Sequence, residues 1–283
     1  MQKPEYHIIS FSGGKDSTAV VERKMELGER IDEVLCCDTT MEFPAMLRHI
    51  EKVKQRVEAA GIKFTMLRSL HDFEYLMLEH IPKRKKDHLA DKVGYSWPGP
   101  KSRWCTRALK NQVIDAHIRT LKQKYEVIQY IGIAADELHG LERKNNNGPG
   151  MHMPLVEWGW TEADALAYCY GKGYDWEGLY EIFDRVSCWC CPLQSLAELR
   201  KLQENFPELW KKLKELDDQT WRDFKDNGQS VENLGRRFDL EEALTEAGYS
   251  IKDKRFFTDL RMFIAGEITI PDILQEREKL RSK

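Results

Sequence analysis

The chain contains no apolar run long enough to cross a membrane, for which about 20 residues would be needed. Its first residues, Met1–Glu5, lead directly into a strand-like segment and carry no apolar stretch of the kind found in secretory signals. The sequence also lacks an internal repeat. We therefore expect a cytoplasmic protein that makes no membrane contact.

The chain also has little net charge. Its 44 basic and 47 acidic side chains give −3 at pH 7, so overall electrostatics do not predict a dedicated nucleic-acid binder. A local basic run, Lys83–Lys86, could still contact a phosphate backbone. Nucleic acid therefore stays open as a partner, with little to support it.

Disulfide bonds are not expected, because a cytoplasmic protein keeps its thiols reduced. An odd number of cysteines, several of them clustered, points instead to metal or redox chemistry. The seven cysteines are Cys36, Cys37, Cys105, Cys169, Cys188, Cys190 and Cys191.

The first third of the chain alternates between strand and helix patterns. β-Branched, aromatic and other apolar residues predict strands at Tyr6–Phe11, Glu33–Cys37 and Lys63–Leu67. Apolar residues at helical spacing predict helices at Ser17–Leu27 and Pro44–Ala60. This βαβαβ order is typical of a parallel sheet with right-handed crossovers.

The pattern becomes less regular and then wholly helical. Residues 70–100 read as a helix and a long loop, Thr106–Lys122 as a helix, and Val127–Ile133 as a further strand. The remainder predicts helices without a strand signal. We expect an α/β domain over residues 1–194, in which helices sandwich a parallel sheet, and a C-terminal helical region over residues 195–283. Aromatic side chains in that region leave a homodimer interface open.

The turn Ser12–Ser17, between the first strand and the first helix, carries the clearest chemical signal. Its two glycines let bare amides approach an anion, and the following helix adds its own unpaired amides and the positive end of its dipole. Lys15 can neutralise negative charge, and Asp16 beside a phosphate is best explained as a Mg²⁺ partner or an anchor of the turn. The spacing is not that of a Walker A loop.

This turn resembles the PP-loop of the ATP pyrophosphatase superfamily, and the chain resembles that superfamily's phosphoadenosine phosphosulfate (PAPS) reductase branch over roughly residues 6–195. One departure is Ala134, which stands where the family usually has arginine. The matching segments after the turn are Asp38–Pro44, Trp104–Thr106 with Leu109 and Lys110, Gly132–Glu137 with Arg143, Pro154–Trp158, and Cys188–Pro192.

The resemblance implies a fold of the adenine nucleotide alpha hydrolase type, which is Rossmann-like, with the nucleotide across the carboxyl ends of the strands. Asp38 and its neighbours would face the adenosine end. Residues expected to bind the nucleotide are Ser10, Ser12, Gly13, Gly14, Lys15, Asp16, Ser17, Asp38, Thr39 and Thr40. Residues expected to act in catalysis are Lys15, Asp16, Asp136 and Arg143.

The cysteines supply a candidate metal site. Thiolates spaced as in Cys188–Cys191 can converge on one metal, and the family pattern places Cys105 at the head of a helix. Cys105, Cys188 and Cys191 could hold a 4Fe-4S cluster with one iron left open, whereas the addition of Cys190 gives four ligands for zinc or a closed cluster. The sequence leaves iron and zinc open.

Three functions follow from these features. The favoured hypothesis is an enzyme that cleaves Mg²⁺-bound ATP to AMP and pyrophosphate, adenylates a substrate, and couples this to sulfur transfer from a metal-bound sulfur or a cysteine persulfide, fed by a sulfur donor protein. The alternative is reduction of PAPS or adenylylsulfate with a partner thiol, because no cysteine follows Cys191 to act as a nucleophile on a C-terminal tail. The third is a non-catalytic nucleotide-sensing subunit with structural zinc.

Overall fold

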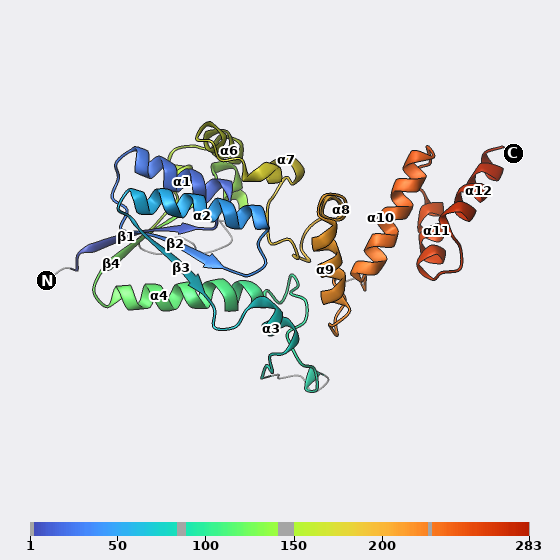
Figure 1. The fold of residues 1–283 in the computed structure, drawn as a ribbon, viewed down its shortest axis with the longest axis horizontal. Coiled ribbons are helices and arrows are strands. Elements are labelled where there is room, and N and C mark those ends of the chain that lie inside the picture. The colour runs from blue at the N-terminus through green and yellow to red at the C-terminus, as the bar shows by residue number, and fades with distance from the viewer. Residues whose placement is uncertain (1–2, 84–88, 141–149, 226–227, 283) are drawn as a thin grey trace. The chain divides into compact units, whose positions relative to one another are not determined.

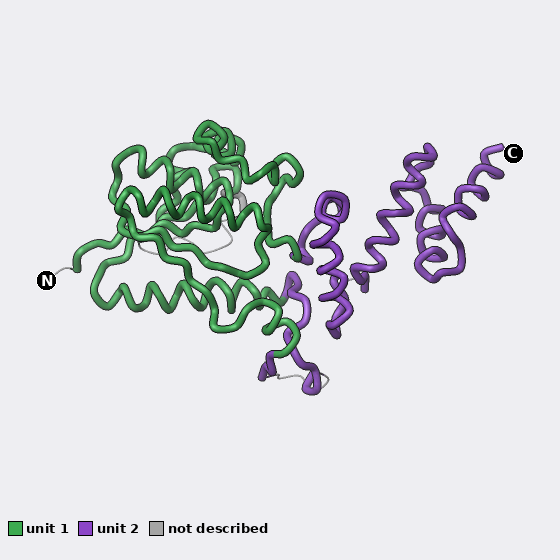
Figure 2. The backbone as a smooth tube through the Cα atoms, in the orientation of Figure 1, with its two compact units in different colours: residues 1–79, 102–190 green, residues 80–101, 191–283 purple. Residues whose placement is uncertain are grey.

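The computed structural model describes residues 3–83, 89–140, 150–225 and 228–282. It divides into two compact units, shown in Figure 2. Unit 1 comprises residues 1–79 and 102–190, and unit 2 comprises residues 80–101 and 191–283. The segment 80–101 therefore groups with the C-terminal residues rather than with the sheet that precedes and follows it in the chain.

Unit 1 is built on a five-stranded sheet in the order β3-β2-β1-β4-β5. Its strands are β1 (Glu5–Phe11), β2 (Glu33–Asp38), β3 (Lys63–Arg68), β4 (Glu126–Ile131) and the short β5 (Met151–His152). All four pairings are parallel. The predicted fold class, a parallel sheet between helices followed by helices, is confirmed.

Helices cover both faces of this sheet (Figure 1). On one face lie α1 (Lys15–Glu26) and α2 (Pro44–Ala59), and on the other lies α4 (Gln112–Lys122). The apolar face of α4 packs against Ile8, Leu35 and Val127 of the three central strands. The helix extends toward its N-terminus through a π-helical segment, η2 (Thr106–Asn111).

The strand order places a topological switch at β1. From β1 the chain first moves outward through β2 to β3, and it later returns to form β4 on the other side of β1. The connections after β1 and β4 consequently diverge, which leaves a crevice at the carboxyl ends of these two strands. Open α/β sheets bind ligands at this position.

Unit 1 also contains shorter helical elements. They are α3 (Phe73–Leu78), η3 (Ala135–Gly140), α5 (Pro154–Glu157), α6 (Glu162–Gly171), η4 (Trp176–Gly178) and α7 (Leu179–Ile182). Of these, α6 packs against α1 and begins with the predicted cap, because Thr161 and Asp164 form a reciprocal capping box.

Unit 2 is helical throughout its regular elements. These are α8 (Leu196–Asn205), α9 (Pro207–Asp217), α10 (Val231–Glu246), α11 (Lys254–Ile264) and α12 (Ile270–Arg281). Ser195 begins α8 as expected, since its side chain accepts a hydrogen bond from the amide of Glu198. No helix among the described residues is both long and apolar enough to span a membrane.

Trp97 explains why the segment 80–101 belongs to unit 2. Its side chain is fully buried, and its indole nitrogen donates to Asp217 Oδ1 at 2.7 Å. The ring meets Phe224 edge-on at a centroid distance of 4.9 Å. The other oxygen of Asp217 accepts from the amide of Val231, at the start of α10. One buried carboxylate thus joins this segment, α9 and α10.

A buried ion pair holds α12 against α11. Arg277 Nε donates to Asp259 Oδ2 at 2.7 Å, and both side chains are about 5% exposed (4% and 6%). Truncation of one partner leaves the other charge buried without compensation. We expect Arg277→Ala to lower the free energy of unfolding of unit 2 by about 3–5 kcal/mol in a urea titration followed by circular dichroism.

The neighbouring residue supplies a matched control. Glu276 pairs with Arg255 across the same two helices, but at exposed positions, with 57% of the glutamate side chain accessible. Glu276→Ala should cost less than about 1 kcal/mol. Equal effects of the two substitutions would contradict a special role for the buried pair.

Candidate functional site

The turn between β1 and α1 requires glycine at Gly13. This residue has φ of +83°, and a Cβ atom there would lie 2.7 Å from Met46 Sδ and 2.8 Å from Ile50 Cγ1 of α2. Both the backbone conformation and the close packing of α2 thus exclude a larger residue. The sequence prediction of a sharp strand-to-helix turn at this position agrees with this geometry.

Hydroxyl groups close the turn onto the first turn of α1. Ser17 Oγ donates to the carbonyl of Gly14 at 3.0 Å and accepts from the amide of Ser12 at 3.1 Å. Thr18 Oγ1 donates to the same carbonyl and meets the ring of buried His49 at 3.0 Å. Because these hydroxyls satisfy the polar groups at the base of the turn, its shape is set before any ligand arrives.

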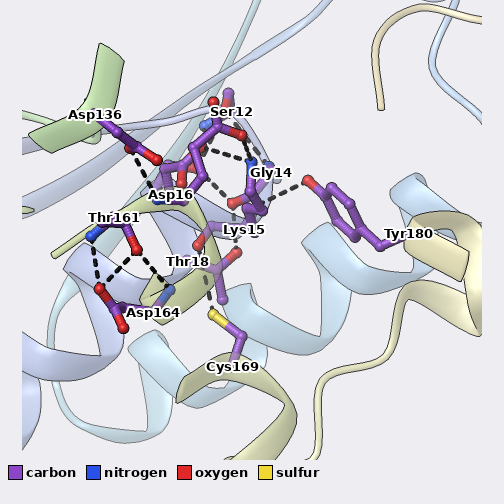
Figure 3. Close-up of polar contacts among 12 residues, drawn as sticks. Ser12, Gly14, Lys15, Asp16, Thr18, Asp136, Thr161, Asp164, Cys169 and Tyr180 are labelled. Carbon is purple, nitrogen blue, oxygen red and sulfur yellow. Dashed lines mark hydrogen bonds and ion pairs between the residues drawn. The ribbon is translucent and has the colours of Figure 1, made fainter. Parts of the chain in front are cut away.

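Two amides at the N-terminus of α1 are left for a ligand. The amide of Lys15 donates to the hydroxyl of Tyr180 at 2.9 Å, as Figure 3 shows. Within the described part of the chain, the amides of Asp16 and Ser17 have no hydrogen-bond acceptor. Unpaired amides and the positive helix end together favour an anion.

A cavity of about 180 Å³ opens beside this turn. Serine hydroxyls and Gly132 line one part of it, and apolar side chains line another. Its walls come from the carboxyl ends of β1, β2 and β4 and from the start of α4, which is the crevice defined by the strand order. The lining residues are Ser10, Phe11, Ser12, Ser17, Leu35, Cys37, Lys110, Ile114, Ile131 and Gly132.

Gly132 lets the end of β4 approach the start of α1. A Cβ atom at this position would lie 2.7 Å from the amide nitrogen of Ser17 and 2.8 Å from the carbonyl carbon of Asp16. The obstacle is backbone rather than a flexible side chain, so neither segment can give way cheaply. This contact sets the width of the crevice at the predicted anion site.

Lys15 does not line the cavity. Its side chain is almost fully buried, and its ammonium group contacts Glu162 at 2.5 Å and Asp16 at 3.4 Å. Burial lowers the pKa of Lys15, but its hydrogen bond to Glu162 and the charge of Asp16 outweigh burial and raise it overall. Lys15 therefore remains a cation that ties α1 to the first residue of α6.

Asp16 has an unsatisfied carboxylate oxygen. Oδ1 is buried and has no hydrogen-bond partner among the described residues, whereas Oδ2 faces Lys15. Burial raises the pKa of Asp16, Lys15 opposes this effect, and the charges of Glu162 and Glu137 add to it, so that the pKa lies at about 6. A divalent cation would compensate this carboxylate, so the residues present fit the predicted Mg²⁺ at one ligand, Asp16.

Two other predicted residues, Asp136 and Asp38, accept hydrogen bonds from nearby backbone amides. Asp136 Oδ1 accepts a hydrogen bond from the amide of Glu162 at 3.0 Å and so anchors the start of α6 (Figure 3). Arg143 lies outside the described residues. Asp38, at the end of β2, accepts from the amide of Thr40 at 2.7 Å, and Thr40 has a left-handed backbone with φ of +66°.

Lys110 is the cation that lines the cavity. It has no hydrogen-bond or ion-pair partner among the residues described. Burial lowers the pKa of Lys110, but Glu42 and the thiols of Cys188, Cys37 and Cys105 outweigh burial and raise it overall. Cys188 Sγ in turn lies 3.5 Å from Glu42 Oε1, and Thr39 Oγ1 donates to the same oxygen at 2.8 Å.

The predicted metal ligands are Cys105, Cys188, Cys190 and Cys191. Two of them, Cys105 and Cys188, act on the same side chain, since both raise the pKa of Lys110. Over the described ranges, no group of three or more His, Cys, Asp or Glu side chains is already arranged to hold a metal ion. The ligand set and the choice between a cluster and zinc stay predictions from the sequence.

Comparison with protein families identifies the sheet domain. The family model of the phosphoadenosine phosphosulfate reductase domain matches residues 6–194, about two thirds of the chain. The chain belongs to this family. The predicted family is thereby confirmed, and the matched residues span β1 to the residues after Cys191.

Other relatives resemble the chain more loosely. Two uncharacterized proteins of Methanocaldococcus jannaschii, MJ0066 and MJ0973, are 28% and 26% identical to it over 72% of its length. The aligned part makes up only 40% and 45% of these two relatives.

Two solved structures show a distant likeness. A PAPS reductase from Candida auris in complex with phosphate has 13% identity and a TM-score of 0.41, over 65% of this chain and 81% of the reductase. The U34-tRNA thiolase NcsA from Methanococcus maripaludis, with its [4Fe-4S] cluster, has 15% identity and a TM-score of 0.40, over 90% of this chain and 77% of the thiolase.

Four residues that shape the turn could not be predicted from the sequence. Glu162 pairs with Lys15, His49 supports Thr18, and Trp176 and Tyr180 contact the glycine loop. All four lie at least 31 residues from their partners in the chain. One signal was present, the capping box at Thr161, which predicted the helix that Glu162 begins but not the approach of Glu162 to Lys15.

Gly132 provides a direct test of the crevice. Gly132→Ala would force a methyl group against the backbone of α1, and we expect it to lower the free energy of unfolding by about 1–3 kcal/mol. Gly171→Ala is the matched control, because nothing lies within 4 Å of a Cβ atom at that helical position. The control should stabilise the protein by up to about 1 kcal/mol in the same urea titration.

His49 should make unit 1 sensitive to acid. Burial lowers the pKa of His49 from 6.5 to about 3, and the charge of Lys52 adds to this effect. Below about pH 6.5 the unfolded chain binds a proton at this histidine, whereas the folded chain does not bind it until about pH 3. The free energy of unfolding therefore falls as the pH falls through this window. This residue alone should cost about 2 kcal/mol between pH 7 and pH 5.

The contribution of His49 can be isolated by substitution. His49→Gln should flatten the dependence of the free energy of unfolding on pH in this window, whereas His152→Gln, at an exposed position, should leave it as in the wild type. An unchanged slope in His49→Gln would show that the ring is not held neutral by the fold.

Proposed function

We propose that this protein binds Mg²⁺-ATP in the crevice between β1 and β4 and cleaves it to AMP and pyrophosphate, adenylating a substrate. The observation that carries the proposal is the pair of unpaired amides at Asp16 and Ser17, beside a cavity and an unsatisfied carboxylate oxygen. The amides suit phosphate oxygens, and the carboxylate suits the cation that accompanies ATP.

The cavity suits the two ends of such a nucleotide. Its hydroxyl-rich part, at Ser12 and Ser17, adjoins the turn and would face the phosphates. Its apolar part, at Leu35, Ile114 and Ile131, would accept the adenine ring, for which a pocket of low polarity is typical. In this orientation the α-phosphate would lie between the turn and Lys110.

The proposed reaction requires side chains mainly to position the substrate and to stabilise charge. An oxygen of the acceptor would attack the α-phosphorus, the bond between the α- and β-phosphates would break, and pyrophosphate would leave on the turn. Lys110 lines the cavity and forms no hydrogen bond or ion pair with the residues that the structure describes, so it would stabilise the charge that develops at the α-phosphate. Asp16 would hold Mg²⁺, which when bound offsets charge on the departing pyrophosphate.

The product adenylate would then be open to attack by sulfur, which displaces AMP. The family, PAPS reductase-like, is one of sulfur chemistry, and three thiols influence Lys110 beside the cavity. We propose that a donor protein supplies this sulfur. No step here is assigned to a cluster, because no group of three or more ligands is already arranged for a metal among the described residues.

ATP turnover tests the proposal. The full chain, incubated with ATP and Mg²⁺, should release AMP and pyrophosphate in equal amounts, with water attacking the α-phosphorus in place of the acceptor; anion-exchange chromatography and a coupled pyrophosphate assay measure the two products. Asp16→Asn should lower the rate about tenfold or more, because it removes the carboxylate charge that balances the cation. Asp115→Asn, at an exposed position of α4, should retain the wild-type rate.

The family match favours one second function, the reduction of PAPS or adenylylsulfate with a partner thiol. The same protein given PAPS and a dithiol would then release sulfite and adenosine bisphosphate, with no turnover of ATP. Nucleotide binding with neither reaction would favour the sensing subunit instead.

The metal content requires its own measurement. Anaerobic purification, a visible spectrum and elemental analysis would distinguish an iron-sulfur cluster, zinc and the absence of metal. A colourless zinc protein would contradict a cluster, while leaving ATP cleavage untouched.

A further inference from the structure

The segment Trp176–Tyr180, which comprises η4 and the start of α7, holds the glycine turn through two hydrogen bonds. The indole nitrogen of Trp176 donates to the carbonyl of Gly13 at 2.8 Å. The hydroxyl of Tyr180 accepts from the amide of Lys15 at 2.9 Å (Figure 3). The two rings meet edge-on at a centroid distance of 4.8 Å, so they form one aromatic unit.

The contact of Trp176 sets the direction of one loop amide. The carbonyl of Gly13 and the amide of Gly14 belong to the same planar trans peptide and point in opposite directions. Because the indole fixes the carbonyl on its own side, the Gly14 amide faces the other way, where Ser12 Oγ lies at 3.4 Å. A contact of that length is weak, so this amide can still donate to a stronger acceptor placed on the same side.

The contact of Tyr180 satisfies one of the helix-end amides. Burial raises the pKa of Tyr180, so its hydroxyl keeps its proton and accepts from Lys15 as a neutral group. The amide of Lys15 is thereby turned toward Tyr180, and the amides of Asp16 and Ser17 remain for a ligand. The aromatic unit thus divides the amides of the turn between protein and ligand.

The backbone of this segment is strained, which indicates that the surrounding structure holds it in place. Trp176 and Glu177 have φ of +48° and +53°, values that bulky residues adopt rarely, and Gly178 follows with φ of +82°. The surroundings hold Trp176 there: its indole is 1% exposed and packs against His49 at a centroid distance of 4.4 Å. Arg48 forms a two-bond ion pair with Glu177.

We propose that Trp176 and Tyr180 are positioning residues, which fix the turn so that the amides of Gly14, Asp16 and Ser17 face a diphosphate. This inference rests on the proposed function, because it concerns the same phosphate site. It adds that affinity for the phosphates depends on two aromatic side chains from a distant part of the chain, whereas affinity for the adenosine moiety does not.

Pyrophosphate and adenosine separate the two halves of the ligand. We would measure binding of each to the full chain by isothermal titration calorimetry, with Mg²⁺ present. Tyr180→Phe retains the ring and removes only the hydroxyl, so it should weaken pyrophosphate binding about fivefold or more, as should Trp176→Phe. Adenosine affinity and the thermal midpoint of Tyr180→Phe should match the wild type.

Tyr170→Phe is the matched control, because this tyrosine is 40% exposed and its ring lies 6.5 Å from that of Trp176. It should bind both probes as the wild type does. Unchanged or tighter pyrophosphate binding by Tyr180→Phe would overturn the inference, since a hydroxyl that merely blocks the site would give that result. Equal losses for both probes would also overturn it, because they would report general damage.

Failure of the proposed function looks different. In that case the wild-type protein itself would bind neither pyrophosphate nor ATP, and the aromatic contacts would have no phosphate site to position. Wild-type binding together with an unaffected Tyr180→Phe would instead remove only the role of the aromatic unit.

Discussion

The contact between the end of β4 and the start of α1 is the constraint on which the site depends. Gly132 lies against the peptide that links Asp16 and Ser17, the same residues whose amides are left without protein partners. A side chain at this position would close the approach to those amides and push the helix away from the sheet. The cavity and the anion site therefore both depend on one position without a side chain.

Around this contact, several other polar groups of the turn are bound by protein. Ser17 and Thr18 hold the carbonyl of Gly14, and Lys15 is bound to Glu162. Preorganisation of this kind lowers the cost of binding, because the loop need not be ordered by the ligand. It also gives the two lysines separate tasks: Lys15 joins two helices, and Lys110 faces the cavity.

Much of this arrangement could be predicted from local sequence. The strands around Ile8 and Leu35 and the glycine turn are set by apolar pattern and by backbone conformation, which neighbouring residues determine. The partners of the turn could not be predicted, because Trp176 and Tyr180 reach it only after the chain has crossed the sheet. Side chains paired across more than a hundred residues leave no periodic signal. For the same reason, clustered cysteines in the sequence did not predict which thiols would lie near Lys110.

The burial of Trp97 has a consequence for the order in which the protein is made. Its partner Asp217 follows 120 residues later in the chain. At a synthesis rate of about 5–20 residues per second, Asp217 is therefore added on the order of ten seconds after Trp97. In that interval the sheet between the two segments is completed. A large aromatic side chain is thus exposed on the ribosome while unit 1 forms, and a chaperone that recognises such surfaces has time to bind it.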